Sequence, residues 1–471
     1  MLRKKYRIHL IGIGGSGMSG IAEILLQLKF KVTGSDIKES EITKRLADLG
    51  TTIFIGHKKE NIGEVDAIVF SSAIKDDNPE IIEARNRKIP LLHRAEMLFE
   101  LMRMKRGIAV AGTHGKTTTT SILGLILTEA GYDPTVIVGG LVHSSGTNAR
   151  LGRGEYIVVE ADESDGSFMR LTPEIAVVTN IDNDHLDFYT DFKNIVTVFK
   201  DFINRIPFYG FSVVCYDDPH IREILPQINR RVITYGIDSD EADVKAFDIE
   251  EDSNGSNFKI RYKNKVVGKF RINVPGRQYL LNSLAAASVG LLLGIKDRVI
   301  EKSIKEYSGV KRRFQLAGDI NGVKIIDDYG HHPTEIKFTA QSAKKLNPRR
   351  LIAVFQPHRF SRTYYLYKEF TEVLEDNFDL TMLMDIYPAD ETNIYSVSPF
   401  WIYREFKNKD KIILVKDFEE VCSRIKEIVK EGDIVLCLGA GSIAQLVPLI
   451  ADTLRMSNCK LKIGNWGLQN E

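Results

Sequence analysis

The segment 106–121, RGIAVAGTHGKTTTTS, constrains the fold of this chain most strongly. An apolar run at 108–111 predicts a strand, and the Leu-, Ile- and Thr-rich stretch from Thr117 predicts a helix that ends near Ala130. A strand, a glycine turn and a helix N-terminus direct backbone N–H groups and the positive end of the helix dipole at one point. We therefore predict that this segment binds a triphosphate.

The residue types within this phosphate loop fit that chemistry. Gly112 and Gly115 allow the backbone to come close to the phosphates. Lys116 can reach the β- and γ-oxygens, and the Thr117 hydroxyl can hold Mg²⁺. The strict pattern has glycine where this chain has Val110, so the loop is a variant. A turn that only connects two elements is the alternative, but the order of strand, GKT and helix favours phosphate binding.

Size and charge limit the classes of protein to consider. A chain of 471 residues is too long for one ordinary core, so we expect two to four domains. The net charge of +1 gives no sign of a nucleic-acid or membrane-surface partner. The 4 cysteines form no CxxC pair, which suggests reduced thiols. With neither a signal peptide nor a membrane-spanning apolar run, the expected location is the cytoplasm.

A second glycine-rich turn, GIGGSG at 12–17, lies between a predicted strand at 6–11 and a predicted helix at 18–28. The following strand ends at Asp36, where a carboxylate can bind a ribose hydroxyl. From these residues alone, an NAD-type cofactor and a UDP-sugar fit equally well. A glycine turn with packing duties only is the remaining alternative.

Downstream of the phosphate loop, a predicted strand at 156–159 ends at Glu160, where nucleotide-binding folds place a metal-positioning acid. The next predicted strand leads into His185, which stands among three aspartates. Because the carboxyl ends of parallel strands meet at one edge of a sheet, we expect Glu160 and His185 to meet near Thr117. A surface histidine is the alternative for His185 by itself.

The alternation of strands and helices continues to the C-terminus and predicts three α/β domains. We expect a Rossmann-like N-terminal domain at 1–105 and a Rossmann-like C-terminal domain at 311–471. The central domain, 106–310, is predicted to be of the P-loop ATPase type, with a parallel sheet and a small antiparallel sheet. The antiparallel part comes from the hairpin pattern at 240–269.

Five motifs, which together span essentially the whole chain, resemble those of the Mur ligases: GTHGKTTTT, EADESD, TNIDNDHLD, DDYGHHPTE and FQPHRFSRT. These enzymes are the ATP-dependent amide ligases of peptidoglycan precursor synthesis. The GIGGSGMSG loop, the SDI that follows it and the HR of the last motif are most similar to the alanine-adding branch. This resemblance implies that ATP phosphorylates the carboxylate of UDP-N-acetylmuramate, and that the amine of L-alanine then attacks the acyl phosphate.

The resemblance also implies roles for individual residues in an ATP site that uses Mg²⁺, with Mn²⁺ as a possible substitute. Arg313 matches an arginine that contacts the γ-phosphate, Asn282 an asparagine on the adenine side, and Asp328 an acid near the ribose. The implied ATP-binding set is Gly112, Thr113, His114, Gly115, Lys116, Thr117, Thr118, Asn282, Arg313 and Asp328. The implied metal ligands are Thr117, Glu160 and His185, and the implied catalytic residues are Lys116, Glu160, His185, Arg313 and His331.

For the other two substrates, the resemblance assigns the first glycine loop to a UDP-sugar rather than to NAD. The implied UDP-sugar-binding residues are Gly12, Gly14, Gly15, Ser16, Gly17, Met18, Asp36, His57 and Ser71. The implied amino-acid-binding residues are His331, His358, Arg359 and Arg362. A planar guanidinium can grip a carboxylate bidentately, so Arg359 or Arg362 is the candidate clamp.

The sequence leaves one contact of the nucleotide pocket and several competing functions open. The family usually has a His-Asn pair where this chain has Gln278-Tyr279, which leaves one contact of the nucleotide pocket in question. A ligase for preformed murein peptides, an NAD-dependent dehydrogenase with an accessory P-loop domain, and a catalytically silent nucleotide-binding regulator are the competing functions. We expect a monomer or a weak homodimer whose three domains approach each other for chemistry.

Overall fold

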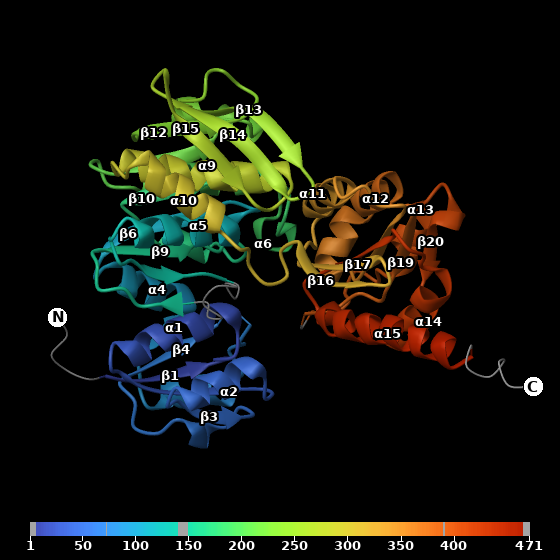
Figure 1. Cartoon of the computed structure of the whole chain (residues 1–471). Helices are drawn as coiled ribbons and strands as arrows, with labels where there is room; N and C mark the ends of the chain where they lie inside the picture. The colour runs from blue at the N-terminus through green and yellow to red at the C-terminus, as the bar shows by residue number, and fades with distance from the viewer. Residues whose placement is uncertain (1–5, 72, 140–148, 390, 465–471) are drawn as a thin grey trace, which may run out of the picture.

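The chain folds into three consecutive α/β parts, each built on its own sheet (Figure 1). The computed structural model describes residues 6–71, 73–139, 149–389 and 391–464. The second part contacts both others, with the first below it and the third beside it in the view of Figure 1. The predicted three-domain α/β class is confirmed.

The first part is a five-stranded parallel sheet with the order β3-β2-β1-β4-β5. Its strands are β1 (Arg7–Ile11), β2 (Lys31–Asp36), β3 (Thr52–Ile55), β4 (Ala67–Phe70) and β5 (Leu91–His93). Its helices are α1 (Ser16–Gln27), α2 (Glu41–Asp48), α3 (Pro79–Asn86) and α4 (Arg94–Met102). Helix α1 packs against strands of the second part, so the glycine turn that precedes it faces the junction between the two parts.

The second part is a ten-stranded mixed sheet with the order β15-β14-β13-β12-β11-β10-β6-β9-β7-β8. The parallel strands are β6 (Arg106–Ala111), β7 (Thr135–Ile137), β9 (Tyr156–Glu160), β10 (Ile175–Val178), β11 (Phe211–Cys215) and β12 (Val232–Gly236). Strand β8 (Ala149–Arg150) is antiparallel to β7, and β13 (Val244–Asp252), β14 (Gly255–Tyr262) and β15 (Lys265–Ile272) form the predicted hairpins.

Helices cover this central sheet and bury its middle strands. They are α5 (Lys116–Glu129), α6 (Leu186–Tyr189), α7 (Phe192–Asn204), α8 (Pro219–Ile224), α9 (Arg277–Leu292) and α10 (Asp297–Glu306). From Ile108 to Ala111, β6 has no exposed side chain, as expected for a parallel strand with both faces covered. Helices α5 and α9 pack together, and both are buried around most of their circumference.

The third part is a six-stranded sheet with the order β16-β17-β21-β18-β19-β20, parallel except for β16. Its strands are β16 (Gln315–Ile320), β17 (Val323–Asp328), β18 (Leu351–Phe355), β19 (Leu380–Leu383), β20 (Ile412–Leu414) and β21 (Ile434–Leu438). Its helices are α11 (Pro333–Lys344), α12 (Phe360–Asn377), α13 (Pro399–Glu405), α14 (Phe418–Ile428) and α15 (Leu446–Gly464). Separate apolar clusters fill the two faces of the sheet.

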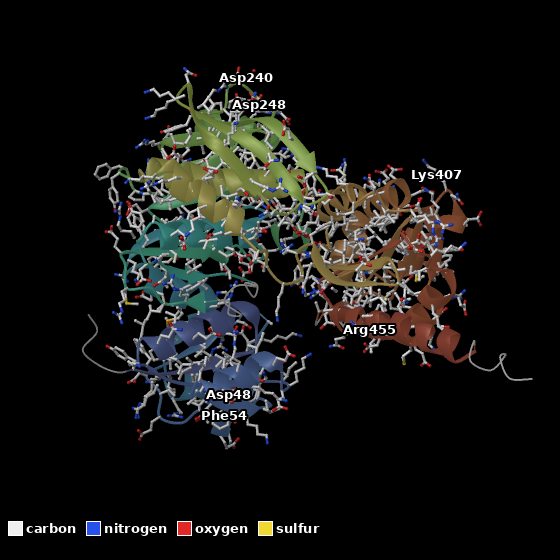
Figure 2. All side chains as sticks on the ribbon, viewed as in Figure 1. Asp48, Phe54, Asp240, Asp248, Lys407 and Arg455 are labelled. Atoms are coloured by element: carbon white, nitrogen blue, oxygen red, sulfur yellow. The ribbon has the colours of Figure 1, made fainter. Side chains whose placement is uncertain are left out.

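Charged side chains lie at the outer edges of all three parts, as Asp48, Asp240 and Lys407 illustrate (Figure 2). None of the helices in the described ranges is both long and apolar enough to cross a membrane. The segments that follow β6 and β10 meet the starts of α11 and α12 where the second and third parts touch. This meeting point contains most of the predicted site residues.

Candidate active site

The phosphate loop has the backbone geometry that its sequence predicts. It joins β6 to α5, with φ of +127° at Gly112 and +85° at Gly115. A Cβ at Gly115 would lie 2.3 Å from Asn282 Oδ1, so a larger residue is excluded by space as well as by conformation. The loop is tied to the end of β10, since the His114 backbone N–H donates to Asn180 Oδ1 at 2.9 Å.

Lys116, the first residue of α5, is fully paired within the loop and with one acid. Its ammonium donates to the carbonyl oxygens of Gly112 at 2.7 Å and Thr113 at 3.1 Å. It also lies 2.8 Å from a carboxylate oxygen of Glu163. Burial alone would lower the pKa of Lys116, but the acids at 160–163 raise it. Lys116 is therefore a cation that is fixed in position where a phosphate would bind.

Thr117 and Glu160 lie together as predicted. The Thr117 hydroxyl is 2.9 and 3.0 Å from the two carboxylate oxygens of Glu160, which ends β9. The Gly139 backbone N–H donates to the same carboxylate at 2.6 Å. A hydroxyl beside a carboxylate offers the hard oxygen ligands that Mg²⁺ prefers.

His185 lies near this pair but contacts other residues. It has a left-handed φ of +57°, and its Nε2 is 3.5 Å from Asp184 and 4.0 Å from Glu163. Among the contacts of the described chain, none joins His185 to Glu160 or Thr117. Burial lowers the pKa of His185, which favours the neutral ring that can ligate a metal.

Arg362, one of the two predicted carboxylate clamps, already pairs with a carboxylate of the protein itself. Its Nε and Nη2 donate to both oxygens of Asp184 at 2.9 and 3.1 Å, and both side chains are buried. Its Nη1 lies 3.3 Å from the ring and the carbonyl of His358. The pKa of Asp184 falls well below its usual range, because the arginine outweighs the effect of burial.

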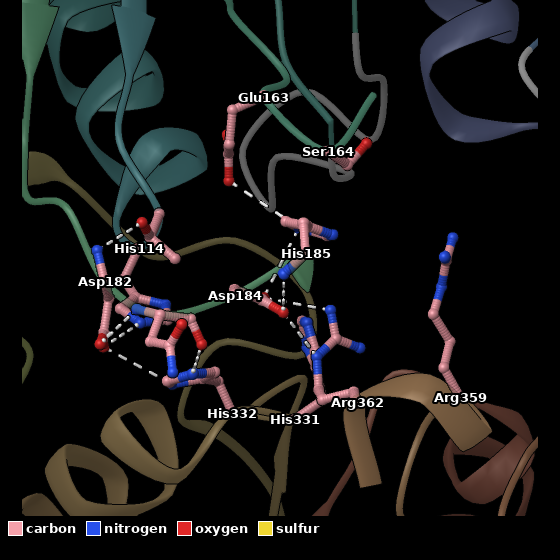
Figure 3. A network of polar contacts seen from close by, with 12 residues as sticks. His114, Glu163, Ser164, Asp182, Asp184, His185, His331, His332, Arg359 and Arg362 are labelled. Carbon is pink, nitrogen blue, oxygen red and sulfur yellow. Dashed lines mark hydrogen bonds and ion pairs between the residues drawn. The ribbon is translucent and has the colours of Figure 1, made fainter. Parts of the chain in front are cut away.

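Arg359, the other predicted clamp, stands apart from this network (Figure 3). Its side chain is 34% exposed, with Glu391 at 3.4 Å and Asp187 at 3.6 Å. It directly precedes α12 with φ of +72°, and its backbone N–H donates to the Tyr387 carbonyl at 2.8 Å. Of the two arginines, Arg359 has the donors that a substrate carboxylate could use.

Two cavities meet at this site. One, of about 410 Å³, lies between the second and third parts and is lined by predicted nucleotide residues that include Asn282, Arg313 and Asp328. The other, of about 760 Å³, reaches all three parts, from Gly17 and Arg94 through Lys116 to His331 and Arg359. Residues assigned from sequence to three different substrates thus share one space.

Of the predicted nucleotide residues, Arg313 stands where the cavities meet. Its Nη1 is 3.3 Å from Glu335, and its guanidinium lies over the ring of Tyr329. Asp328 is buried and accepts the backbone N–H groups of Phe314 and Gly330 at 2.7 and 2.8 Å. Burial raises the pKa of Asp328 to about 6.

The residues that replace the family's His-Asn pair lie in the wall of the smaller cavity. Gln278 donates from Nε2 to the Ser342 hydroxyl at 3.1 Å, and so reaches across to α11. Tyr279 is buried, with 5% of its surface exposed. Compared with a His-Asn pair, this chain therefore has a buried tyrosine ring in the cavity wall. It also has a glutamine that links the second part to the third.

Several predicted amino-acid residues also gather here. His331 and His358 have ring centroids 5.8 Å apart, and His358 stacks on Tyr387. Burial lowers the pKa of His331 to about 3 and that of His358 to about 2. Both rings are therefore neutral at physiological pH.

In the first part, the glycine turn is held by the predicted acid, because the Gly14 N–H donates to Asp36 at 2.8 Å. His57 Nδ1 is 3.1 Å from the Ser35 hydroxyl and 3.4 Å from the buried Glu80. Gly12 lies against Ser71, Gly15 precedes α1, and Gly17 lines the larger cavity. Met18 is buried in the apolar core, and the side chain of Ser16 lies outside the described part of the chain.

His114, from the phosphate loop, sits in a polar cluster that joins the second and third parts (Figure 3). Its Nε2 donates to Asp182 at 2.9 Å, and its Nδ1 is 3.5 Å from Glu335. The Thr334 hydroxyl donates to Asp182 at 2.6 Å. Burial acts to lower the pKa of His114, but the two carboxylates raise it to about 9.

In the described part of the chain, two places at this site have ligand types suited to a metal. Besides Thr117 with Glu160, ring or carboxylate atoms of His114, Asp182 and His332 lie within 4.8 Å of one another. These three already satisfy each other and their neighbours, since His332 Nε2 donates to the Asn183 carbonyl and its Nδ1 accepts the Thr334 N–H. This second set is therefore a hydrogen-bonded junction.

Sequence reasoning missed four charged residues of the site: Arg94, Glu163, Asp184 and Glu335. Arg94 lies over the first glycine turn, where a Cβ at Gly17 would be 2.8 Å from its Nη1, and it pairs with Asp162 at 2.8 Å. Glu163, Asp184 and Glu335 belong to motifs already identified, whereas Arg94 lies in none of them. Their contacts depend on segments far away in the chain, which spacing alone does not reveal.

Comparison with known proteins agrees with this geometry. Three family models match in succession: "Mur ligase family, catalytic domain" at residues 7–106, "Mur ligase middle domain" at 110–290, and "Mur ligase, glutamate ligase domain" at 312–441. The chain is also similar to a UDP-N-acetylmuramate–L-alanine ligase of Geotalea daltonii, at 50% identity over 97% of this chain and 99% of that one. A protein of the same name from Aquifex aeolicus is 49% identical over 94% of this chain and 97% of its own length.

Among solved structures, a UDP-N-acetylmuramate-alanine ligase from Thermotoga maritima matches with a TM-score of 0.80 and 26% identity. The match covers 96% of this chain and 100% of that one. A murein peptide ligase from Psychrobacter arcticus shares the fold, with a TM-score of 0.75 and 24% identity over 96% and 99% of the two chains. The family models cover most of the sequence, and the chain belongs to the Mur ligase family.

Proposed function

We propose that this chain joins L-alanine to the lactoyl carboxylate of UDP-N-acetylmuramate, using ATP, in peptidoglycan precursor synthesis. The observation that carries the proposal is the identity of about half of all residues, over nearly the whole length, to ligases of that name. The cavity common to all three parts supports it, because a three-substrate reaction requires one shared space.

ATP would lie with its base and ribose in the smaller cavity and its phosphates on the loop before α5. Tyr279, Asn282 and Asp328 line this cavity, where the first two would face the base and Asp328 the ribose. Lys116 and Arg313 would neutralise charge on the terminal phosphate as it is transferred to the acceptor carboxylate. The phosphate loop's N–H groups and the α5 dipole contribute in the same direction.

A divalent cation, Mg²⁺ or Mn²⁺, fits beside Thr117 and Glu160 because both offer oxygen ligands and adjoin the phosphate loop. When bound, the cation would screen the negative charge that builds up between ATP and the acceptor. His185 would be a nearby ligand on the side of Glu163.

The acceptor would enter from the first part, with its UDP group near Gly14, Gly17 and His57 and its carboxylate pointing into the larger cavity. Arg94, which lines the larger cavity beside Gly17, would neutralise negative charge on the diphosphate. The amino acid would approach from the third part, with its carboxylate on Arg359 and His358 and His331 beside it. Its amine would then attack the acyl phosphate, forming the amide and releasing phosphate.

An assay of phosphate release tests this proposal. The purified chain is given ATP, Mg²⁺ and UDP-N-acetylmuramate, with L-alanine, other amino acids, or a murein tripeptide as the amine. We expect release that depends on L-alanine and yields UDP-N-acetylmuramoyl-L-alanine by mass spectrometry. Turnover with the tripeptide alone would indicate the murein-peptide ligase instead. Tight NAD binding that UDP does not compete with, and no turnover, would favour a dehydrogenase or a silent regulator.

A further inference from the structure

Glu335 lies at the point where the two cavities meet, and it lines both of them. It belongs to the first turn of α11 and is the last residue of the HHPTE motif. Its side chain is only 11% exposed. A carboxylate in such a place needs partners, because a buried charge without them is costly.

Glu335 has partners from three separate segments. The Arg313 Nη1, from the junction before β16, is 3.3 Å away. The His114 Nδ1, from the phosphate loop, is 3.5 Å away. The His331 backbone N–H donates to its Oε2 at 3.1 Å, and the ring Nδ1 lies 3.4 Å from the same oxygen.

This arrangement fixes the direction of the Arg313 guanidinium. Within the described chain, Glu335 is the only carboxylate within ion-pair distance of Arg313. The Tyr329 ring packs against the guanidinium at 5.1 Å, which restricts its plane. A guanidinium has five N–H donors, so a contact through Nη1 leaves others free to face the cavities.

The partners of Glu335 also keep it charged. Burial would raise its pKa, but the cationic His114 and Arg313 hold it well below the usual range. The carboxylate is thus a permanent acceptor across the pH range in which the chain would work.

We propose that Glu335 is a positioning residue of the ligation reaction. It holds Arg313 between the nucleotide cavity and the three-part cavity, and it links that arginine to the phosphate loop through His114 and to the start of α11 through His331. This inference rests on the proposed function, because it gives Arg313 the terminal phosphate as its target.

A double-mutant cycle tests it directly. Glu335→Gln, Arg313→Lys and the double variant are compared for kcat and for KM of each substrate. We expect Glu335→Gln to lower kcat about tenfold or more. A misplaced Arg313 guanidinium would slow the chemical step and leave the KM for the UDP-sugar unchanged. The double variant should be no slower than Arg313→Lys. Independent, multiplying losses would overturn the proposal, because Glu335 would then not act through Arg313.

Glu174→Gln is the matched control, since Glu174 also pairs with an arginine, Arg106, but lines neither cavity. It should retain wild-type kcat. Glu335→Asp keeps the charge and shortens the side chain by one methylene, so it covers the case in which the amide variant does not fold. Glu335→Asp should also have a lower kcat. Wild-type turnover in a folded Glu335→Gln or Glu335→Asp variant would overturn the proposal.

A binding measurement separates this inference from the proposed function. Wild-type protein should prefer a non-hydrolysable ATP analogue over ADP, and Glu335→Gln should reduce that preference about threefold or more, as Arg313→Lys does. An unchanged preference overturns the inference even if alanine-dependent turnover is found. Loss of preference without any alanine-dependent turnover in the wild type supports the inference and rejects only the substrate assignment.

Discussion

The ammonium of Lys116 lies 2.8 Å from the carboxylate of Glu163, three residues after the acid that contacts Thr117. The two acids of the EADESD motif therefore take different partners from the phosphate loop. Glu163 is 3% exposed, and burial raises its pKa to about 7. When it is ionised, its negative charge stands close to the position proposed for the triphosphate with little screening by water.

Replacing Glu163 with glutamine should tighten nucleotide binding. An arriving triphosphate has to compete with Glu163 for Lys116, and it is also repelled by the carboxylate. We expect the Kd for a non-hydrolysable ATP analogue to fall about threefold to tenfold by isothermal titration calorimetry, the range of one weakly screened charge contact. Weaker binding by a folded Glu163→Gln variant would contradict this prediction. It would show that Glu163 positions Lys116 for the nucleotide and does not compete with the nucleotide for it.

Replacing Glu160 with glutamine should raise the concentration of Mg²⁺ that turnover requires. The amide keeps an oxygen and the side-chain shape but loses the charge that attracts a divalent cation. We expect kcat at low Mg²⁺ to fall about a hundredfold, with partial recovery at high Mg²⁺. A Mg²⁺ dependence identical to that of the wild type would contradict the proposed cation position.

Arg359 and Arg362 should give different kinds of defect. Arg359 has free donors, so Arg359→Lys should raise the KM for L-alanine about tenfold or more with little loss of stability. Arg362→Lys breaks a bidentate pair with Asp184 and should lower the melting temperature. Thermal unfolding and steady-state kinetics of both variants test this; the reverse pattern would assign the carboxylate clamp to Arg362.

His114 should make stability depend on pH in the alkaline range. Its folded pKa of about 9 lies above the ordinary value of 6.5, so the folded chain binds this proton more tightly. The resulting stabilisation, on the order of 3 kcal/mol, is fully present below pH 6.5 and is lost as pH rises through 9. The difference in melting temperature between wild type and His114→Asn should shrink over that interval. A difference that stays constant from pH 6 to 10 would contradict the cationic assignment.

Much of the fold could be predicted because its signals are local. Apolar runs followed by glycine turns mark β1 and β6, and alternation marks the hairpins β13–β15. The end of β9 at Glu160 followed from the same rule, that chemistry gathers at the carboxyl ends of parallel strands. These predictions need no knowledge of how the three parts pack.

The site was harder to predict where a contact joins distant segments. From sequence, Arg362 is predicted to be a substrate clamp, but Asp184, 178 residues earlier in the chain, accepts hydrogen bonds from its Nε and Nη2. From sequence, Glu335 resembles any acidic residue in the first turn of a helix. Only the structure shows that it contacts His114 and Arg313. Residue type identifies such groups as charged, but only their packing decides which charges remain free.

The buried pair of Arg362 and Asp184 has a consequence for how the third part could separate from the second. Its members are 4% and 7% exposed, so a small separation would leave two charges neither paired nor hydrated. Intermediate openings are therefore the least stable, whereas a wide opening lets water reach both groups. Movement at this interface should be all-or-none, with two populated arrangements and few molecules between them.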